Sequence, residues 1–173
     1  TITKHYLMIR PVSKTAIYAG PSTSLTADSY EIVDGGLLDG HKIVEPLRYE
    51  GTINVVADGV GVTKYSNIDV SSINIVDAEG NNVTALYTIA TDRGTLRIEP
   101  IDIVIIAGSN SASYSGNAIT PDPAYTVVGN LLSNHQLVDV VVKGSQTYVG
   151  SSETYIESYD IVDKSNNISV KGN

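Results

Sequence analysis

The sequence predicts an all-β protein built from two related β-sandwich domains, the second of which lacks its C-terminal hairpin. Three observations predict this fold class. One stretch occurs twice, strand-forming and turn-forming residues dominate throughout, and no segment longer than a turn has helical periodicity with capping residues. A length of 173 residues allows one large domain or two small ones, and the repeat favours two.

The repeat is clearest where residues 103–116 (IVIIAGSNSASYSG) match residues 7–20 (LMIRPVSKTAIYAG) at an offset of 96. Each copy is an apolar run, a small polar segment and then Tyr-x-Gly, which is typical of a strand, a turn and a second short strand. The identical pairs are Ile9/Ile105, Ser13/Ser109, Ala16/Ala112, Tyr18/Tyr114 and Gly20/Gly116.

The match continues downstream at offsets of 94, 86 and 85, because the first copy carries about ten extra residues, mostly between His41 and Ile75. We therefore expect one domain over residues 1–99 and a second, incomplete one over residues 100–173. The further matched segments are Gly35–His41 with Gly129–His135, Ile75–Asp77 with Ile161–Asp163, and Asn81–Thr84 with Asn166–Ser169.

The early strands of the first domain end at proline or glycine. Pro11 and Gly20 close the first two, and Gly35 closes the third, because neither residue type favours the interior of a strand. Pro46 interrupts the fourth, so this strand is expected at a sheet edge or at a bulge. The candidates, in order, are residues 6–9, 14–18, 29–33 and 43–49.

The later strands of the first domain alternate more cleanly. Asp58-Gly59 between two β-rich runs is a hairpin signal. Ile73 and Ile75 fall on one face of their strand, as do Leu96 and Ile98 on the last one. The candidates, in order, are residues 52–56, 60–65, 72–76, 86–90 and 95–99.

The second domain repeats this scheme and then stops short. Residues 163–167 form the turn that follows the last shared strand, and no later segment matches Tyr87–Ile89 or Thr95–Ile98. The second domain is therefore predicted to lack its last hairpin. Its strand candidates are residues 101–106, 112–114, 124–128, 136–142 and 153–162.

Composition narrows the classes of function. The net charge is −8 and the eleven Lys and Arg residues are scattered, which argues against nucleic acid and against an anionic membrane surface as partners. No apolar run approaches the roughly 18 residues of a membrane span. The chain has no Cys, so no disulfide supports its core. It starts at Thr1 without a signal peptide, which indicates a processed chain or a fragment.

Several segments together resemble a known family of repeats. They are Gly94–Pro100, Ile103–Ser109, Ser113–Gly116, Gly144–Thr147 and Val149-Gly150, followed by Ile-Val-Asp and Asn-Asn-Ile-Ser. In combination they resemble the glycine-rich, mostly-β, immunoglobulin-like tandem repeats (MBG/YDG type) of large bacterial surface proteins and adhesins. The usual Tyr-Asp-Gly reads Tyr-Ala-Gly and Tyr-Ser-Gly here, and the first copy has an insertion between Lys42 and Gly59. The resemblance implies an extracellular stalk or fibre and supplies no catalytic residue.

Candidate ligand-binding residues each have a structural alternative. Asp77, Glu79 and Asn81 resemble an oxygen-rich calcium turn, but their spacing fails the EF-hand pattern and also suits a plain hairpin. His41 and His135 occupy equivalent repeat positions, where a ligand or pH-sensing role competes with that of a turn residue. No Cys or second His lies nearby in the sequence to complete a zinc site. Calcium is thus the metal ion for which the sequence offers candidate ligands, and we expect no cofactor.

Two segments have the form of glycosylation acceptors, Asn82-Val-Thr84 and Asn167-Ile-Ser169, although shared descent alone explains their equivalence. No Gly-x-Ser-x-Gly elbow or nucleotide-binding loop with the right context is present, so we expect no enzyme.

The missing hairpin has a mechanical consequence. A sandwich without its last strands exposes unpaired backbone groups, which can accept a strand from another chain. The N-terminal segment Thr1–Ile9 is the expected donor, through Ile2, Tyr6, Leu7 and Ile9. The alternative is that the continuation of a longer chain supplies the hairpin.

These observations favour a structural, non-catalytic pair of domains from an extracellular cell-surface protein or filament, whose partners are copies of itself or adjacent repeats. The alternative is a glycan- or surface-binding adhesin module. An exposed patch formed by Tyr148, Tyr155 and Tyr159 would favour this binding function.

Overall fold

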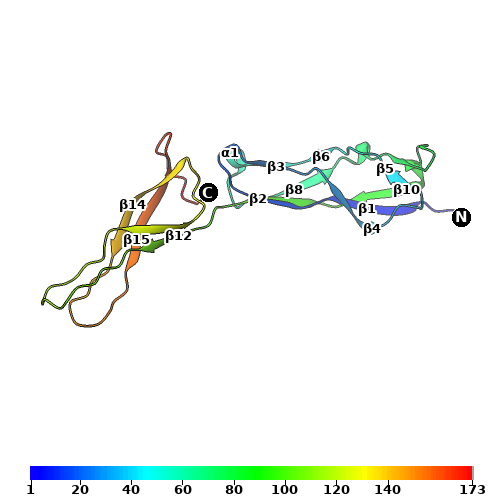
Figure 1. Ribbon diagram of the computed structural model, residues 1–173. Coiled ribbons are helices and arrows are strands. Elements are labelled where there is room, and N and C mark those ends of the chain that lie inside the picture. The colour runs from blue at the N-terminus through cyan, green and yellow to red at the C-terminus, as the bar shows by residue number, and fades with distance from the viewer. Residues whose placement is uncertain (173) are drawn as a thin grey trace. The chain divides into compact units, whose positions relative to one another are not determined.

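The computed structural model describes residues 1–172 and divides into two compact units, Thr1–Glu99 and the part of the chain from Pro100 onward (Figure 1). Both units consist mostly of β-strands with short connections, and the few helical turns are three or four residues long. The chain is therefore mostly β, in agreement with the predicted class.

Unit 1 contains eleven short strands and three helical turns. The strands are β1 (His5–Pro11), β2 (Lys14–Ile17), β3 (Ser24–Thr26), β4 (Tyr30–Gly35), β5 (Lys42–Ile43), β6 (Tyr49–Glu50), β7 (Thr52–Asn54), β8 (Thr63–Ile68), β9 (Ile75–Val76), β10 (Tyr87–Thr91) and β11 (Gly94–Glu99). The helical turns are α1 (Val55–Asp58), η1 (Val70–Ser72) and η2 (Thr84–Leu86).

Two sheets form the body of unit 1. In the first, β1 lies between β10, to which it is parallel, and β4, to which it is antiparallel. In the second, β11 lies between β2, to which it is parallel, and β8, to which it is antiparallel, with β6 beyond β8. Two smaller pairs, β3 with β7 and β5 with β9, complete the unit. Strands β10 and β11 do not pair with each other, so the last hairpin predicted for this unit is wrong. They follow one another as one extended segment, parallel to β1 and then to β2 at a constant offset of 82 residues, and so contribute one strand to each sheet.

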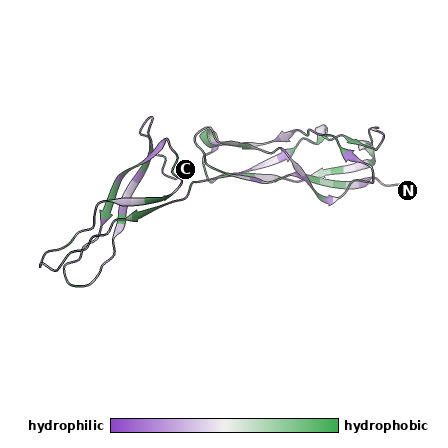
Figure 2. Ribbon diagram, viewed as in Figure 1, coloured by the Kyte–Doolittle hydropathy of each residue, from purple (hydrophilic) through white to green (hydrophobic). Residues whose placement is uncertain are grey.

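The core of unit 1 follows from strand alternation. Leu7 and Ile9 on β1 and Leu96 and Ile98 on β11 are completely buried, because alternate residues of a strand point to one face. Figure 2 shows apolar residues distributed along the strands of both units. One cluster packs the first sheet against the β5–β9 pair and consists of Leu7, Ile9, Ile43, Leu47, Ile68, Ile73, Ile75 and Tyr87.

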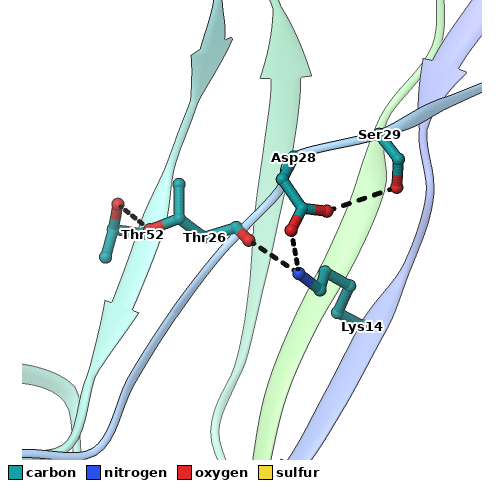
Figure 3. A network of polar contacts seen from close by, with 5 residues as sticks. All are labelled: Lys14, Thr26, Asp28, Ser29 and Thr52. Carbon is teal, nitrogen blue, oxygen red and sulfur yellow. Dashed lines mark hydrogen bonds and ion pairs between the residues drawn. The ribbon is translucent and has the colours of Figure 1, made fainter.

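A polar network joins three strands at the surface of unit 1 (Figure 3). The Lys14 ammonium lies 2.8 Å from an Asp28 carboxylate oxygen and 3.4 Å from the Thr26 carbonyl oxygen. Ser29 donates to the same carboxylate, and the hydroxyls of Thr26 and Thr52 are 3.0 Å apart. The hydrogen bond from Lys14 holds the pKa of Asp28 below its usual range. The network links β2 to β3 and β7 and has a structural role.

Some of the predicted strands are wrong, in part or entirely. Of the strand predicted over residues 43–49, only Ile43 and Tyr49 lie in strands, β5 and β6. Residues 55 and 56 belong to α1, because the Asn54 side chain accepts a hydrogen bond from the Val56 N–H and caps a helical turn. Residues 112–114 form no strand. Their counterparts in unit 1 pair with β11, and the described part of unit 2 has no strand in that position. Strand β3 was not predicted.

Unit 2 consists of two hairpin-like strand pairs. Strand β12 (Ile103–Ala107) is antiparallel to β13 (Tyr125–Gly129), and β14 (His135–Lys143) is antiparallel to β15 (Tyr155–Asp163). Within residues 100–172 only three residues are buried: His135, Val162 and Asp163. The apolar face of unit 2 is therefore much less covered than that of unit 1.

The strand pairs of unit 2 keep the register of unit 1. Leu7 faces Gly35 across β1 and β4, and Ile103 faces Gly129 across β12 and β13. These are the residues that the repeat matches, at offsets of 96 and 94.

The second strand pair also keeps its register. Ile43 faces Ile75 across β5 and β9, and Leu137 faces Ile161 across β14 and β15. Leu137 follows Ile43 at an offset of 94, and Ile161 follows Ile75 at an offset of 86. Both pairs of strands thus meet at equivalent positions in the two units.

The turn after these strands corrects the sequence alignment. The Val83 N–H donates to the Ile75 carbonyl, and the Val170 N–H donates to the Ile161 carbonyl, so the turn is one residue longer in unit 2. Asn82 pairs with Val76, and Ser169 pairs with Val162. The structural counterpart of Asn82 is therefore Ser169 and not Asn167.

Candidate functional site

The side of β12 opposite β13 is the most unusual feature of unit 2. In unit 1 the equivalent strand, β1, has a partner on each side, whereas β12 has only β13 among residues 1–172. Ile103 and Ile105 are half-buried, but their counterparts Leu7 and Ile9 are completely buried. A strand edge next to partly exposed apolar side chains is a template for pairing with another strand.

A hollow of about 560 Å³ lies between residues 110–121 and residues 144–154. Its walls correspond to known strands of unit 1. The offset of 96 matches β2 with residues 110–113, and the offset of 86, carried back from Ile161, matches β8 with residues 149–154. All of the first group and all but Glu153 of the second line the hollow. In unit 1, β11 lies between β2 and β8.

The tyrosine that occurs in both copies of the repeat is buried in unit 1 and exposed in unit 2. Tyr18 is 2% exposed and its N–H donates to the carbonyl of Glu99, at the end of β11. Its counterpart Tyr114 is 64% exposed and lines the hollow. The hollow thus lies where a strand equivalent to β11 would lie.

The repeated histidine lies in a turn that both units share. In unit 1 the Tyr87 hydroxyl, from β10, lies 2.7 Å from His41 Nδ1 and accepts a hydrogen bond of 3.0 Å from the Leu38 N–H. In unit 2 the His135 N–H donates to the Leu132 carbonyl, as His41 does to Leu38, so the same turn is present. No counterpart of Tyr87 occurs among residues 100–172.

A small cavity of about 20 Å³ beside His135 is lined by apolar residues of unit 2. Ile103, Leu131, Ile161 and Val170 correspond to Leu7, Leu37, Ile75 and Val83, which belong to the core cluster of unit 1 or pack against it. The remaining lining residue, Ile101, corresponds to His5, which pairs with Tyr87. Unit 2 therefore contains counterparts of these core residues of unit 1, and the cavity lies beside Ile101, the counterpart of the residue that pairs with β10 in unit 1.

The predicted calcium residues form a hairpin turn. The Asp77 carboxylate accepts hydrogen bonds from the N–H groups of Glu79 and Asn81 and from the Asn81 side chain, at 2.8 to 3.1 Å. The bonds from Asn81 hold the pKa of Asp77 below its usual range. Within residues 1–172, no three His, Asp or Glu side chains gather as a metal site would require.

The equivalent carboxylate in unit 2, Asp163, has a similar role in the turn that the sequence predicts over residues 163–167. It accepts hydrogen bonds from the Ser165 N–H and hydroxyl and from the Asn134 side chain, which together hold its pKa below its usual range. Asp163 faces His135 across β14 and β15. The only advance signal was that both residues recur in the repeat.

The two glycosylation candidates lie in exposed turns. The Asn82 side chain accepts a hydrogen bond from the Thr84 N–H, and Asn167 has a positive φ of 54°. Both side chains are exposed, and their modification stays a prediction.

The predicted donor segment is mostly part of unit 1. Leu7 and Ile9 are buried in the central strand of a sheet and cannot enter another domain while unit 1 is folded. Tyr6 is 40% exposed but pairs with Thr88, and Ile2 precedes β1 and is fully exposed. The expectation that Thr1–Ile9 donates a strand therefore conflicts with the fold, because donation would dismantle the first sheet.

The three tyrosines of the proposed binding patch do not gather at one place. Tyr148 lines the hollow, together with Tyr114, whereas Tyr155 is exposed on β15 outside it. The Tyr159 ring lies 3.9 Å from the Lys171 ammonium. An aromatic pair, Tyr114 and Tyr148, therefore replaces the predicted trio as the candidate ligand-stacking surface.

The chain has no significant match to any family model, curated protein or solved structure. No helix within residues 1–172 has the length and apolar character needed to cross a membrane.

Proposed function

We propose that this chain is a structural, non-catalytic building block of an extracellular cell-surface protein or filament, made of two tandem immunoglobulin-like units. The observation that carries the proposal is the shared register of the strand pairs, Leu7 with Gly35 and Ile103 with Gly129. The features that recur in both units are strand pairs, a turn histidine and a turn aspartate. Repetition of scaffold features is typical of stalks and fibres, which are built from stacked modules.

Immunogold labelling tests this proposal. An antibody raised against the chain should label fibres or an outer layer on intact cells of the source organism. Labelling only after the cells are permeabilised would contradict the extracellular role. A control antibody against an intracellular protein must show no label on the same intact cells.

A second candidate function is glycan binding, which the hollow between residues 110–121 and 144–154 favours. Tyr114 and Tyr148 offer aromatic faces, and Asn110, Ser111 and Gln146 offer amide and hydroxyl groups. Such a set suits a neutral saccharide, which combines apolar ring faces with hydroxyls. If this function holds, Tyr148→Ala should abolish oligosaccharide binding in a glycan array, whereas Tyr155→Ala should not.

A further inference from the structure

We propose that unit 1 bears tensile load along the chain, through a clamp formed by two parallel segments. The leading segment, residues 5–18, contains β1 and β2, and the trailing segment, residues 87–99, contains β10 and β11. This inference rests on the proposed structural function and specifies the mechanical work of one unit. The two segments lie side by side at a constant offset of 82 residues.

The clamp runs through both main sheets of unit 1. Five residue pairs join β1 to β10, and four join β2 to β11. The pairing begins at His5 and Tyr87 and ends at Ile17 and Glu99. At that end the Tyr18 N–H donates a hydrogen bond of 2.8 Å to the Glu99 carbonyl oxygen. The contact between the two segments therefore extends over the full length of the trailing segment.

Hydrogen bonds also join the two segments between their paired strands. The Asp92 N–H donates to the Ile9 carbonyl oxygen at 2.9 Å, just after β10. The Thr95 N–H donates to the Ser13 hydroxyl at 3.0 Å, just before the pairing of β2 with β11 begins. The two parallel ladders are thus connected, and neither segment can slide in one sheet without sliding in the other.

The direction of the strands determines how tension acts on this clamp. Figure 1 shows β1 and β10 beside the N-terminus and β2 at the opposite end of unit 1. Tension on the chain pulls the leading segment from before His5 and the trailing segment from after Glu99. Because the segments are parallel, these forces oppose each other along the strand axis. The evenly spaced bonds of a parallel pair then share the load in shear.

Each segment is anchored at the end where the load acts. Strand β1 has β4 on its other side, and β11 has β8 on its other side. The buried side chains of these two loaded strands are Leu7 and Ile9 on β1 and Leu96 and Ile98 on β11, all completely buried. Sliding of the segments would therefore break both ladders and expose apolar core surface to water at the same time.

The antiparallel pairing of β1 with β4 predicts weak resistance in another direction. Leu7 faces Gly35, so the end of β4 lies beside the start of β1, and β4 is an edge strand. A force that pulls residues 3 and 36 apart separates these strands from that end. The residue pairs then open one after another, and each carries the whole load in turn. Unit 1 should therefore resist force strongly only along the clamp.

The test applies a constant load to the full chain in optical tweezers. The chain has no Cys, so introduced pairs of Cys attach the handles at chosen positions. Thr3→Cys with Asp102→Cys, both at exposed positions, loads the clamp and leaves unit 2 outside the loaded path. Thr3→Cys with Gly36→Cys separates β4 from β1, and a Cβ at Gly36 would meet no atom within 4 Å.

The two pulling directions should give different opening rates. At the same load, the second pair of handles should open at least about 100-fold faster, because one hydrogen bond at a time resists it. The first pair should extend in one step of up to roughly 340 Å, the extended length of residues 5–99 at about 3.6 Å per residue. Equal opening rates, or gradual extension of the first pair, would overturn the proposal.

Two matched core variants locate the resistance. Leu96, in the clamp, and Ile75, on β9 outside it, are both completely buried, so Leu96→Ala and Ile75→Ala should each lower the free energy of unfolding in urea. In the first pulling direction, Leu96→Ala should raise the unfolding rate at fixed load at least about 10-fold. Ile75→Ala should raise it less than about 3-fold, because its contacts are still intact when the clamp opens. Equal acceleration would overturn the proposal.

The outcomes separate this inference from the proposed function. Surface labelling of cells together with equal opening rates in the two directions would reject the clamp alone. Direction-dependent resistance without surface labelling would reject the extracellular role alone. The comparison of directions uses an unmodified core, so it remains decisive if either core variant fails to fold.

Discussion

Gly35 and Gly129 show at the residue scale what the repeat preserves. Both have a positive φ, 72° and 116°, and each lies against the neighbouring strand. A Cβ at Gly35 would collide with the Tyr6 carbonyl oxygen, and one at Gly129 would lie 2.7 Å from the carbonyl oxygen of Asp102, the residue equivalent to Tyr6. The same backbone geometry therefore requires glycine in both units.

We expect Gly35→Ala and Gly129→Ala each to destabilise its own unit by about 1–2 kcal/mol or more, because L-residues disfavour this φ and the Cβ has no space. Chemical denaturation of each variant measures the change. Gly36→Ala is the control, since its φ is not positive and a Cβ there would meet no atom within 4 Å. Equal effects of Gly35→Ala and Gly36→Ala would contradict the argument.

Tyr49 is a residue-scale weakness of unit 1. Its hydroxyl is buried and has no hydrogen-bond partner among residues 1–172. Burial, with a smaller effect of the Glu45 charge, raises its pKa to about 12. Because the folded pKa is raised, burial favours the neutral phenol over the phenolate. The free energy of unfolding is therefore unaffected by this titration below pH 10 and falls as the pH rises from about 10 to 12.

Replacing Tyr49 by Phe should remove the unsatisfied hydroxyl and raise the free energy of unfolding by roughly 1 kcal/mol. It should also reduce the loss of stability between pH 10 and 12. Urea denaturation at pH 7 and pH 11 measures both effects. Tyr155→Phe, at an exposed position, should change neither, and a lower stability of Tyr49→Phe at pH 7 would count against this reasoning.

At the scale of elements, β1 and β12 are the same strand in two environments. Ile9 is completely buried between two partner strands, whereas its counterpart Ile105 is half-buried beside one. The stabilisation that each isoleucine provides should therefore differ, although their sequence contexts match.

We expect Ile9→Ala to cost about 2–5 kcal/mol in unit 1, because it removes a fully packed side chain. Ile105→Ala should cost less than half as much in the free chain, because solvent already reaches its side chain. Denaturation of the two variants under the same conditions makes the comparison. Similar costs would mean that the apolar face of unit 2 is covered in solution.

The element scale also shows what the sequence could predict. Alternation placed β11 correctly, since Leu96 and Ile98 are buried as expected. It failed at residues 55 and 56, where the capping side chain of Asn54 outweighs the strand preference of two valines. It also failed at residues 112–114, because a strand needs a partner that the described part of unit 2 does not contain. Strand pairing is non-local, so local patterns cannot report it.

The candidate site was only partly predictable for the same reason. The lack of a match to Tyr87–Ile89 and Thr95–Ile98 predicted an open edge, but the donor assignment to Leu7 and Ile9 conflicts with their burial in unit 1. An apolar terminal segment has the same composition whether it is spare or central to a sheet. The pairing of β1 with both β10 and β4 decides between these alternatives, and it appears only in three dimensions.

At the scale of the whole molecule, the two units should differ in stability. Unit 1 has a cluster of eight buried residues, whereas residues 100–172 contain three buried residues in all. Since buried apolar area is the main stabilising contribution, unit 2 should open at a lower free energy than unit 1. Native-state hydrogen exchange of the full chain should therefore give two groups of amides, with β12–β15 exchanging through the lower-energy opening.

Appending residues 85–99 after Lys171 provides the matched control for this difference. The added segment should slow exchange in β12–β15 and leave β1 and β11 unchanged, because it adds apolar contacts only to unit 2. The same extended chain with Leu96→Asp and Ile98→Asp in the added copy should restore the original exchange rates. If the unmodified chain already protects β12 as strongly as β1, the core of unit 2 is closed without a further strand.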